Sequence, residues 1–137
     1  MSATAYYRIA ALLLALYAAL HTMGFLGFKP TSAEARAVLD GMYAVEMRVG
    51  RATFTYGGFY RGFGLAITVY LVFSAYLAWH MGALAGASPG AIGALAWVFV
   101  AVNAALLVLA FAYFSLLPAI LSALVTLALA VAALKLP

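Results

Sequence analysis

Four long runs of apolar residues dominate the chain, each separated from the next by a polar stretch or by a stretch with glycine or proline. A helix needs about 20 apolar residues to cross the hydrocarbon core of a bilayer. The pattern therefore predicts four membrane-spanning helices and one substantial loop, 29–57, between the first and second of them. The predicted spans are 6–28, 58–80, 90–113 and 116–135.

The 29–57 loop contains a weaker helical pattern of its own. Thr31 and Glu34 have the spacing of a capping box, which predicts a helix with Thr31 as its N-cap. Apolar residues then recur at helical intervals: Ala35, Val38, Met42, Val45 and Val49. We predict a short amphipathic helix over 32–48 that lies on the membrane surface and is ended by Gly50. The fold class is then all-α, a single integral membrane four-helix bundle over residues 1–137.

Composition agrees with this pattern. Hydrophobic residues make up 69% of the 137 residues and charged residues only 7%, whereas a soluble domain carries about 25% charged residues. Such a chain lacks the polar side chains that would cover its surface in water. The sequence contains no cysteine, which excludes disulfide exchange and thiolate metal sites.

The net charge of +4 is concentrated in one region. Five of the seven basic residues and all three acids lie between Lys29 and Arg61, which indicates a solvated loop at a lipid headgroup surface rather than a nucleic-acid-binding face. Four spans place both termini on one side of the bilayer. The basic excess then favours a cytoplasmic 29–57 loop, with only Arg8 and Lys135 on the other side.

Two motifs carry a family resemblance. The H-x-x-G run at 21–24 and the F-Y-x-G-F-G-L run within 58–65 resemble a family of small, uncharacterised bacterial four-helix membrane proteins that is loosely DoxX-like. The resemblance implies a four-helix fold in the bacterial inner membrane and implies no activity. The family often has an acid before the F-Y pair, where this chain has Gly57 and Gly58.

His21 is the most distinctive candidate for a ligand site. Polar groups inside a membrane usually face the interior of the helix bundle, and His21 lies about 9 Å below the end of its predicted helix at 1.5 Å per residue. It is either a structural histidine that donates a hydrogen bond and holds helices together, or a ligand-contacting or proton-carrying residue with Tyr17 on the same helical face. Asn103, near the middle of the third span, is either an interhelical clamp or a cavity-lining residue.

A second cluster is predicted at the loop side of the bilayer. Tyr56, Tyr60, Arg61 and Glu46 are expected near the mouth of the bundle, above His21. They could grip a polar or anionic headgroup while its tail enters the bundle. The alternative is an ordinary interfacial belt of aromatic and arginine side chains.

We expect no cofactor and no metal. His21 and His80 differ in depth by about 20 Å at 1.5 Å per helical residue, so a single chain does not supply two axial ligands to one haem. No acid lies in a predicted span, which argues against a proton-coupled exporter. The sequence contains no zinc-protease motif and no serine–histidine–aspartate set.

Small residues point to helix association. Gly58 and Gly62 form a G-x-x-x-G motif extended by Gly64, which permits close approach of another helix. Alanines also line one face of the third span (Ala91, Ala94, Ala101, Ala105, Ala112) and one of the fourth (Ala119, Ala123, Ala130, Ala133). Four helices cannot bury every such face among themselves, so surplus faces favour contacts between chains.

Three functions stay open at this point. The favoured one is a structural or accessory bundle that forms a homo-oligomer or joins a larger membrane complex, with a hydrophobic ligand near His21 as an additional role. The second is a lipid- or quinone-binding protein. The third is a membrane enzyme acting on a hydrophobic substrate, for which only His21 and the tyrosines offer titratable groups.

Overall fold

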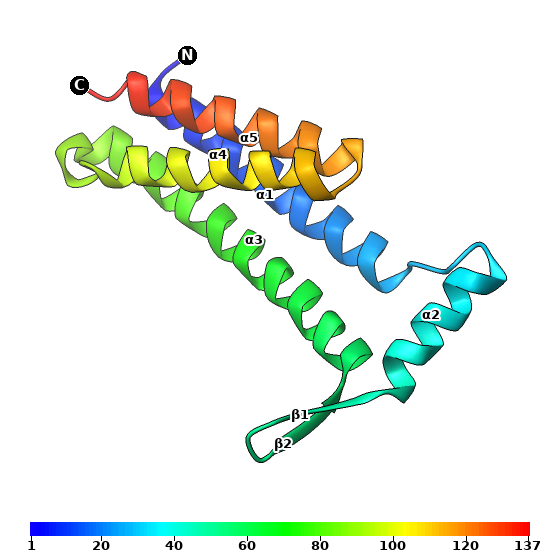
Figure 1. Cartoon of the computed structure of the whole chain (residues 1–137). Coiled ribbons are helices and arrows are strands. Elements are labelled where there is room, and N and C mark those ends of the chain that lie inside the picture. The colour runs from blue at the N-terminus through cyan, green and yellow to red at the C-terminus, as the bar shows by residue number, and fades with distance from the viewer. The chain divides into compact units, whose positions relative to one another are not determined.

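The computed structural model describes residues 1–137 and contains five α-helices, one 3-10 turn and a two-stranded hairpin (Figure 1). Four helices are long and apolar enough to cross a membrane: α1 (Ala3–Leu26), α3 (Tyr56–Ala87), α4 (Leu95–Tyr113) and α5 (Leu116–Leu134). The predicted all-α class is confirmed, and the hairpin is an addition to it. The chain divides into two compact units, one formed by 1–18 with 71–137 and the other by 19–70.

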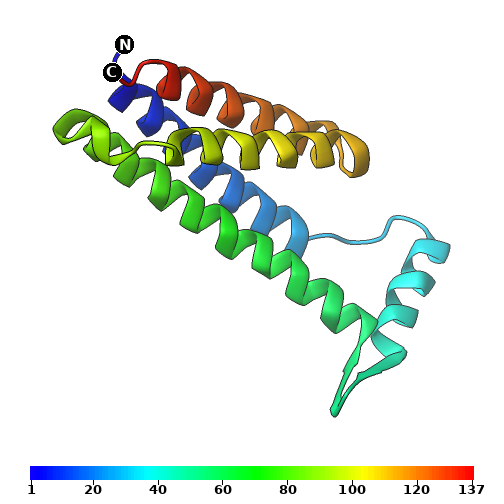
Figure 2. The same ribbon diagram turned by 60° about the vertical axis from the view of Figure 1, so that its left-hand side comes forward.

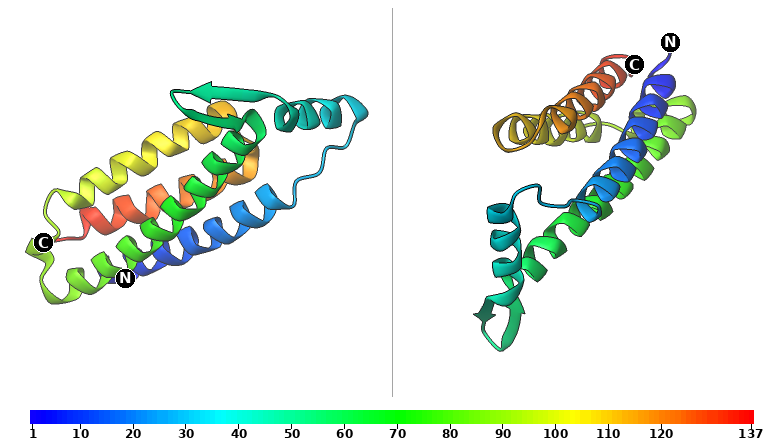
Figure 3. Two further views of the ribbon diagram at one scale, coloured as in Figure 1. Left: turned by 90° about the horizontal axis from the view of Figure 1, so that it is seen from below. Right: turned by 90° about the vertical axis from the view of Figure 1, so that its right-hand side faces the viewer.

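In the first unit, α4 and α5 run antiparallel and side by side (Figure 2), as the short connection between them predicted. Both chain termini lie at the same end of this unit (Figures 2 and 3). The buried residues of α5 recur at helical spacing and so form one face: Leu121, Ser122, Val125, Ala128, Leu129 and Ala132. Three of these six, Ser122, Ala128 and Ala132, are small. Small side chains let neighbouring helices approach closely, so this unit packs largely through alanine.

The two alanine faces have different surroundings. On α5, Ala119 and Ala133 are buried. On α4, by contrast, Ala101, Ala105 and Ala112 are exposed. Ala123 and Ala130 of the α5 face are half-buried, so the small face of α4 is the more exposed of the two.

Helix α3 is longer than predicted, because residues 82–87 continue the helix instead of forming a turn. Alanine and leucine in this stretch are strong helix formers. Gly82 is buried against α1, where an added Cβ would lie 3.3 Å from both the Tyr7 Cβ and the Arg8 Nε. The glycine thus serves close helix packing rather than a turn.

The connection from α3 to α4 lies later than predicted. A 3-10 turn, η1 (Pro89–Ala91), replaces the expected start of the third span at residue 90. Gly93 has a φ of +50°, a left-handed conformation that interrupts a helix and suits glycine. As a result α4 begins at Leu95, five residues after the predicted start.

In the second unit, α2 (Ala33–Ala44) begins one residue later than the capping box indicated. Ser32, not Thr31, is the N-cap, because its extended backbone lets its hydroxyl accept the Ala35 N–H over 3.1 Å. Hydrogen bonds from the backbone N–H of Glu34 and from Ser32 lower the pKa of the exposed Glu34 carboxyl. The N-terminus of α2 therefore favours the ionised form of Glu34.

The prediction that the loop helix extends to Arg48 is wrong. Helix α2 ends at Ala44, and strands β1 (Glu46–Val49) and β2 (Ala52–Thr55) pair antiparallel, with Val49 opposite Ala52. Valine and threonine favour strands. Gly50, expected to end the helix, instead has a φ of +60° and supplies the hairpin turn.

Glycines on α3 of the second unit differ sharply in their surroundings. An added Cβ at Gly64 would collide with the ring of Phe25 on α1, whereas one at Gly62 would meet nothing within 4 Å. An added Cβ at Gly58 would lie 3.1 Å from the hydroxyl oxygen of Thr55 and near no other atom. That hydroxyl accepts the Gly58 N–H over 3.0 Å and so caps the helix. Of the three glycines that the sequence assigned to helix packing, Gly64 is the one that lies against α1 in this unit.

We therefore expect Gly64→Leu to unfold the α1–α3 contact, because the new side chain must displace the Phe25 ring. Gly62→Leu should leave the stability of the monomer unchanged or slightly raised, since leucine favours a helix over glycine by roughly 1 kcal/mol. Thermal unfolding of both variants, as monomers in detergent, measures the difference. Equal losses of stability would contradict this assignment.

Candidate functional site

His21 is half-buried on α1 and faces α3 of the same unit. Its Nε2 lies 3.0 Å from the backbone carbonyl oxygen of Gly64. A carbonyl oxygen only accepts hydrogen bonds, so Nε2 carries the proton and donates it. This geometry is the structural alternative considered for His21, a histidine that holds two helices together.

A second polar contact lies one residue further along α1. The hydroxyls of Thr22 and Thr68 are 2.9 Å apart and share a hydrogen bond. We refer to the His21–Gly64 and Thr22–Thr68 pairs together as the α1–α3 clamp. Hydrogen bonds between helices in an apolar environment each contribute roughly 0.5–2 kcal/mol, so the clamp fixes the register of α1 against α3.

Aromatic rings surround the clamp on the α1 side. The ring of Phe25 stacks on that of His21 with centroids 5.8 Å apart and planes at 8°. The Tyr60 ring contacts the same phenylalanine at 5.4 Å. Because Gly64 has no side chain, the Phe25 ring can lie directly against α3. The glycine therefore makes room for both the ring and the histidine hydrogen bond.

The predicted cluster at the loop side is only partly brought together. Tyr56, Tyr60 and Arg61 lie in the first two turns of α3, and Glu46 opens β1. All four residues are exposed. Tyr60 alone reaches the clamp, through Phe25. These residues form an exposed rim at the start of α3 and do not enclose a cavity.

Tyr17 and Asn103 belong to the other unit. Asn103 is buried, and its Nδ2 donates to the carbonyl oxygen of Phe99 over 2.9 Å, within α4 itself. Thr126 similarly donates to the Ser122 carbonyl over 2.7 Å. Asn103 therefore satisfies this donor locally rather than across helices, and Tyr17 is half-buried on α1.

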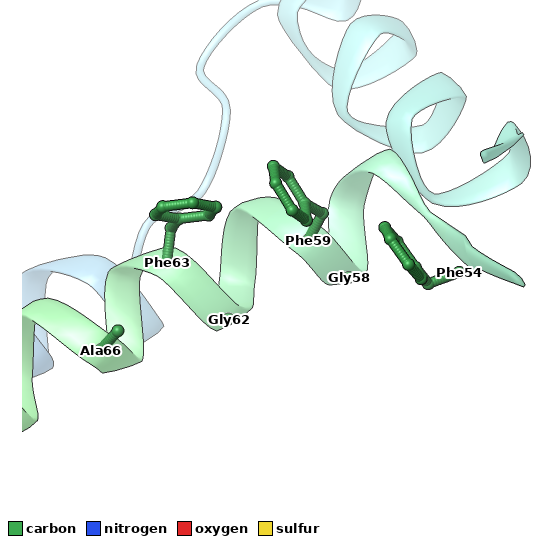
Figure 4. Close-up of a pocket in the computed structure, with 6 residues that line it drawn as sticks. All are labelled: Phe54, Gly58, Phe59, Gly62, Phe63 and Ala66. Carbon is green, nitrogen blue, oxygen red and sulfur yellow. The ribbon is translucent and has the colours of Figure 1, made fainter. Parts of the chain in front are cut away.

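The structure presents a groove on the surface of α3 that the sequence analysis did not identify. It has a volume of about 330 Å³ and is lined by Phe54, Gly58, Phe59, Gly62, Phe63 and Ala66. Figure 4 shows Gly58, Gly62 and Ala66 along one edge of the helix, with three phenylalanine rings beside them. We call this feature the α3 groove. The G-x-x-x-G spacing of Gly58 and Gly62 pointed to this face of α3, but the sequence pattern was interpreted as a packing contact and not as an open groove.

The aromatic wall of the α3 groove is ordered by its own contacts. The rings of Phe54 and Phe59 stack with centroids 5.7 Å apart, and Phe59 meets Phe63 edge-on at 4.7 Å. Such pairs add roughly 0.5–1.5 kcal/mol beyond the area they bury. The wall is thus a row of mutually supported rings beside a floor of two glycines and one alanine.

Titratable chemistry is sparse in both units. No three histidine, cysteine or carboxylate side chains come together where they could hold a metal ion. His80 is exposed, and its ring stacks with that of Tyr76 at 6.1 Å. No protein-family model, curated protein or solved structure matches the chain.

The clamp generates a prediction about His21. His21→Leu should lower the free energy of unfolding by about 1 kcal/mol, the scale of one interhelical hydrogen bond, and should leave the amount of co-purifying lipid unchanged. His21→Gln, which keeps an N–H donor, should recover part of the loss. Chemical unfolding and lipid analysis on the same preparations measure both quantities. Loss of bound lipid with unchanged stability would instead assign His21 to ligand binding.

Proposed function

We propose that the chain is a multi-pass integral membrane protein that works as a non-enzymatic, oligomerising bundle, with the α3 groove as the contact between copies. The observation that carries this proposal is the groove itself. Its floor of Gly58, Gly62 and Ala66 follows one face of a long apolar helix, and within the 19–70 unit no side chain fills it. A helix face of this kind is typical of close helix–helix contacts in bilayers.

Exposed apolar side chains support the membrane part of the proposal. Leu12 on α1, Val69 on α3 and Phe111 on α4 expose 64%, 69% and 68% of their surfaces, and each lies within an apolar helix of spanning length. In water such surfaces would associate non-specifically. In a bilayer they contact acyl chains, and every backbone group of a helix is satisfied within it.

The charged residues of the 27–55 segment support the proposal that this segment lies at one surface of the membrane. It carries all three acids and four of the arginines and lysines, and α2 has no buried residue. Val38 of α2 and Val45, the residue after its end, expose 65% and 53% of their surfaces, which suits a helix that lies on a headgroup layer. A cytoplasmic location for this segment, in a bacterial inner membrane, follows from the basic excess and the DoxX-like resemblance.

We assign a second copy of this chain as the occupant of the groove. Copies inserted in one membrane share their orientation, so a twofold axis normal to the bilayer brings Gly62 of one copy against Gly62 of the other. Backbones without side chains can then touch, and the phenylalanine wall of each copy covers the flank of its partner. A lipid chain would fill the groove without using this self-complementary shape.

The alternative roles receive less support. A lipid- or quinone-binding cavity at His21 would need that side chain to be available, but its Nε2 donates to Gly64 and the α3 groove does not include it. An enzyme acting on a hydrophobic substrate would need a positioned acid and base. Glu46, in the loop-side cluster, is exposed and lies outside the helices.

The test compares Gly62→Leu with Gly24→Leu, because both positions are open within the chain and only Gly62 lies in the groove. Dimerisation is measured by energy transfer between labelled copies in bilayers at several protein-to-lipid ratios. We expect Gly62→Leu to raise the dissociation constant at least tenfold and Gly24→Leu to leave it within twofold.

A monomeric wild-type protein, or equal dimerisation of both variants and the wild type, would overturn the proposal. Loss of association in Ala105→Leu but not in Gly62→Leu would also overturn it, because that result moves the contact to the exposed alanine face of α4.

A further inference from the structure

Arg8 lies in an unusual position for a charged residue on an apolar helix. Its guanidinium carbon lies 3.5 Å from the centre of the Trp79 ring, so the cation of α1 stacks on an aromatic face of α3. Gly82, one turn after Trp79, has no side chain, and an added Cβ there would lie 3.3 Å from the Arg8 Nε. The tryptophan and the glycine together hold the guanidinium close to α3.

No acidic side chain lies in the unit that contains Arg8. The three acids, Glu34, Asp40 and Glu46, all belong to the other unit, residues 19–70. Because α1 crosses the bilayer once in the proposed topology, these acids lie on the opposite side of the membrane from Arg8. An aromatic ring attracts the cation through its face but accepts none of the in-plane N–H groups.

Hydrogen-bond donors at this position are left unpaired. The Nη1 of Arg8 is buried and has no partner, and the same is true of the hydroxyl of the neighbouring Tyr7, a side chain that is 1% exposed. Buried donors without partners are unfavourable. Arg8 as a whole is only half-buried, so an anion from outside the chain would meet the part of the guanidinium that stays open and not the buried Nη1. Planar guanidinium donors match the oxygens of a phosphate.

The residues around Arg8 favour a phosphate that belongs to a phospholipid. Trp79 is half-exposed near the end of α3, as is common for tryptophan at a membrane interface. From it, Tyr76 and Val72 continue along the same helical face and expose 66% and 56% of their surfaces. A phospholipid with its phosphate at Arg8 could lay an acyl chain along these two side chains.

We propose that Arg8 and Trp79 form a binding site for the phosphate group of a phospholipid, on the membrane side that holds both termini. The proposal rests on the membrane location proposed above but not on dimerisation. Arg8 supplies the positive charge and the donors that stay open, Trp79 holds the guanidinium in place, and Gly82 provides the space. Lys135, the other basic residue on that side, follows the last helix and has no aromatic partner.

The experiment uses the full chain in a neutral detergent, with Trp97→Phe so that Trp79 is the only tryptophan. Its fluorescence is titrated with phosphatidylglycerol in mixed micelles and, separately, with inorganic phosphate. We expect saturable binding of the lipid and no response to inorganic phosphate at the same phosphate concentration. Arg8→Gln should weaken lipid binding at least tenfold, whereas Lys135→Gln should change it less than twofold.

Equal lipid affinity in Arg8→Gln and the parent protein would overturn the site. A response to inorganic phosphate as strong as that to the lipid would overturn its assignment to a phospholipid. Should Arg8→Gln fail to fold, Arg8→Lys keeps the charge but loses the planar donors, and unchanged affinity in that variant would contradict the proposal equally. Repeating the titration in Gly62→Leu separates this site from dimerisation, because lipid binding should persist when dimerisation is lost.

Discussion

The rest of this structure depends on one constraint: four long helices direct most of their apolar side chains outward, so burial within the chain does little to hold the helices together. Charged residues make up only 7% of the chain, and the most apolar stretches of α1, α3 and α4 bury only 22% of their residues within the chain. A non-aqueous solvent removes the usual hydrophobic drive for helices to associate. Small-residue contacts, aromatic pairs and a few hydrogen bonds must then position the helices, and the two units use these devices differently.

In the first unit, α4 and α5 pack through small buried residues, and the buried amide of Asn103 donates within its own helix. In the second unit, the α1–α3 clamp places a histidine and a threonine hydrogen bond between helices. The same α3 helix that supplies the carbonyl of Gly64 presents its open face at Gly62, two residues away. One short stretch of glycines thus serves contact inside the chain on one side and leaves a groove on the other.

The sequence predicted the four long helices and the antiparallel α4–α5 pair well, because span length and a two-residue connection are local properties. It missed the hairpin, since Val45 and Val49 fit a helical pattern as well as a strand. It assigned Gly58, Gly62 and Gly64 together to helix packing, because spacing alone cannot tell that Phe25 lies against Gly64 while Gly62 stays open within the 19–70 unit. For His21 the sequence offered two roles, and only the position of the Gly64 carbonyl favours the structural one.

Site-specific labelling tests the membrane arrangement most directly, because the chain has no cysteine and each introduced thiol is unique. Ser2→Cys, Asp40→Cys and Val72→Cys would be treated with a membrane-impermeant maleimide on sealed vesicles of each orientation. The account predicts labelling of positions 2 and 40 from opposite sides and protection of position 72 from both. Labelling of position 72 as fast as that of position 40, in intact vesicles, would contradict a membrane-spanning α3 and with it the proposed function.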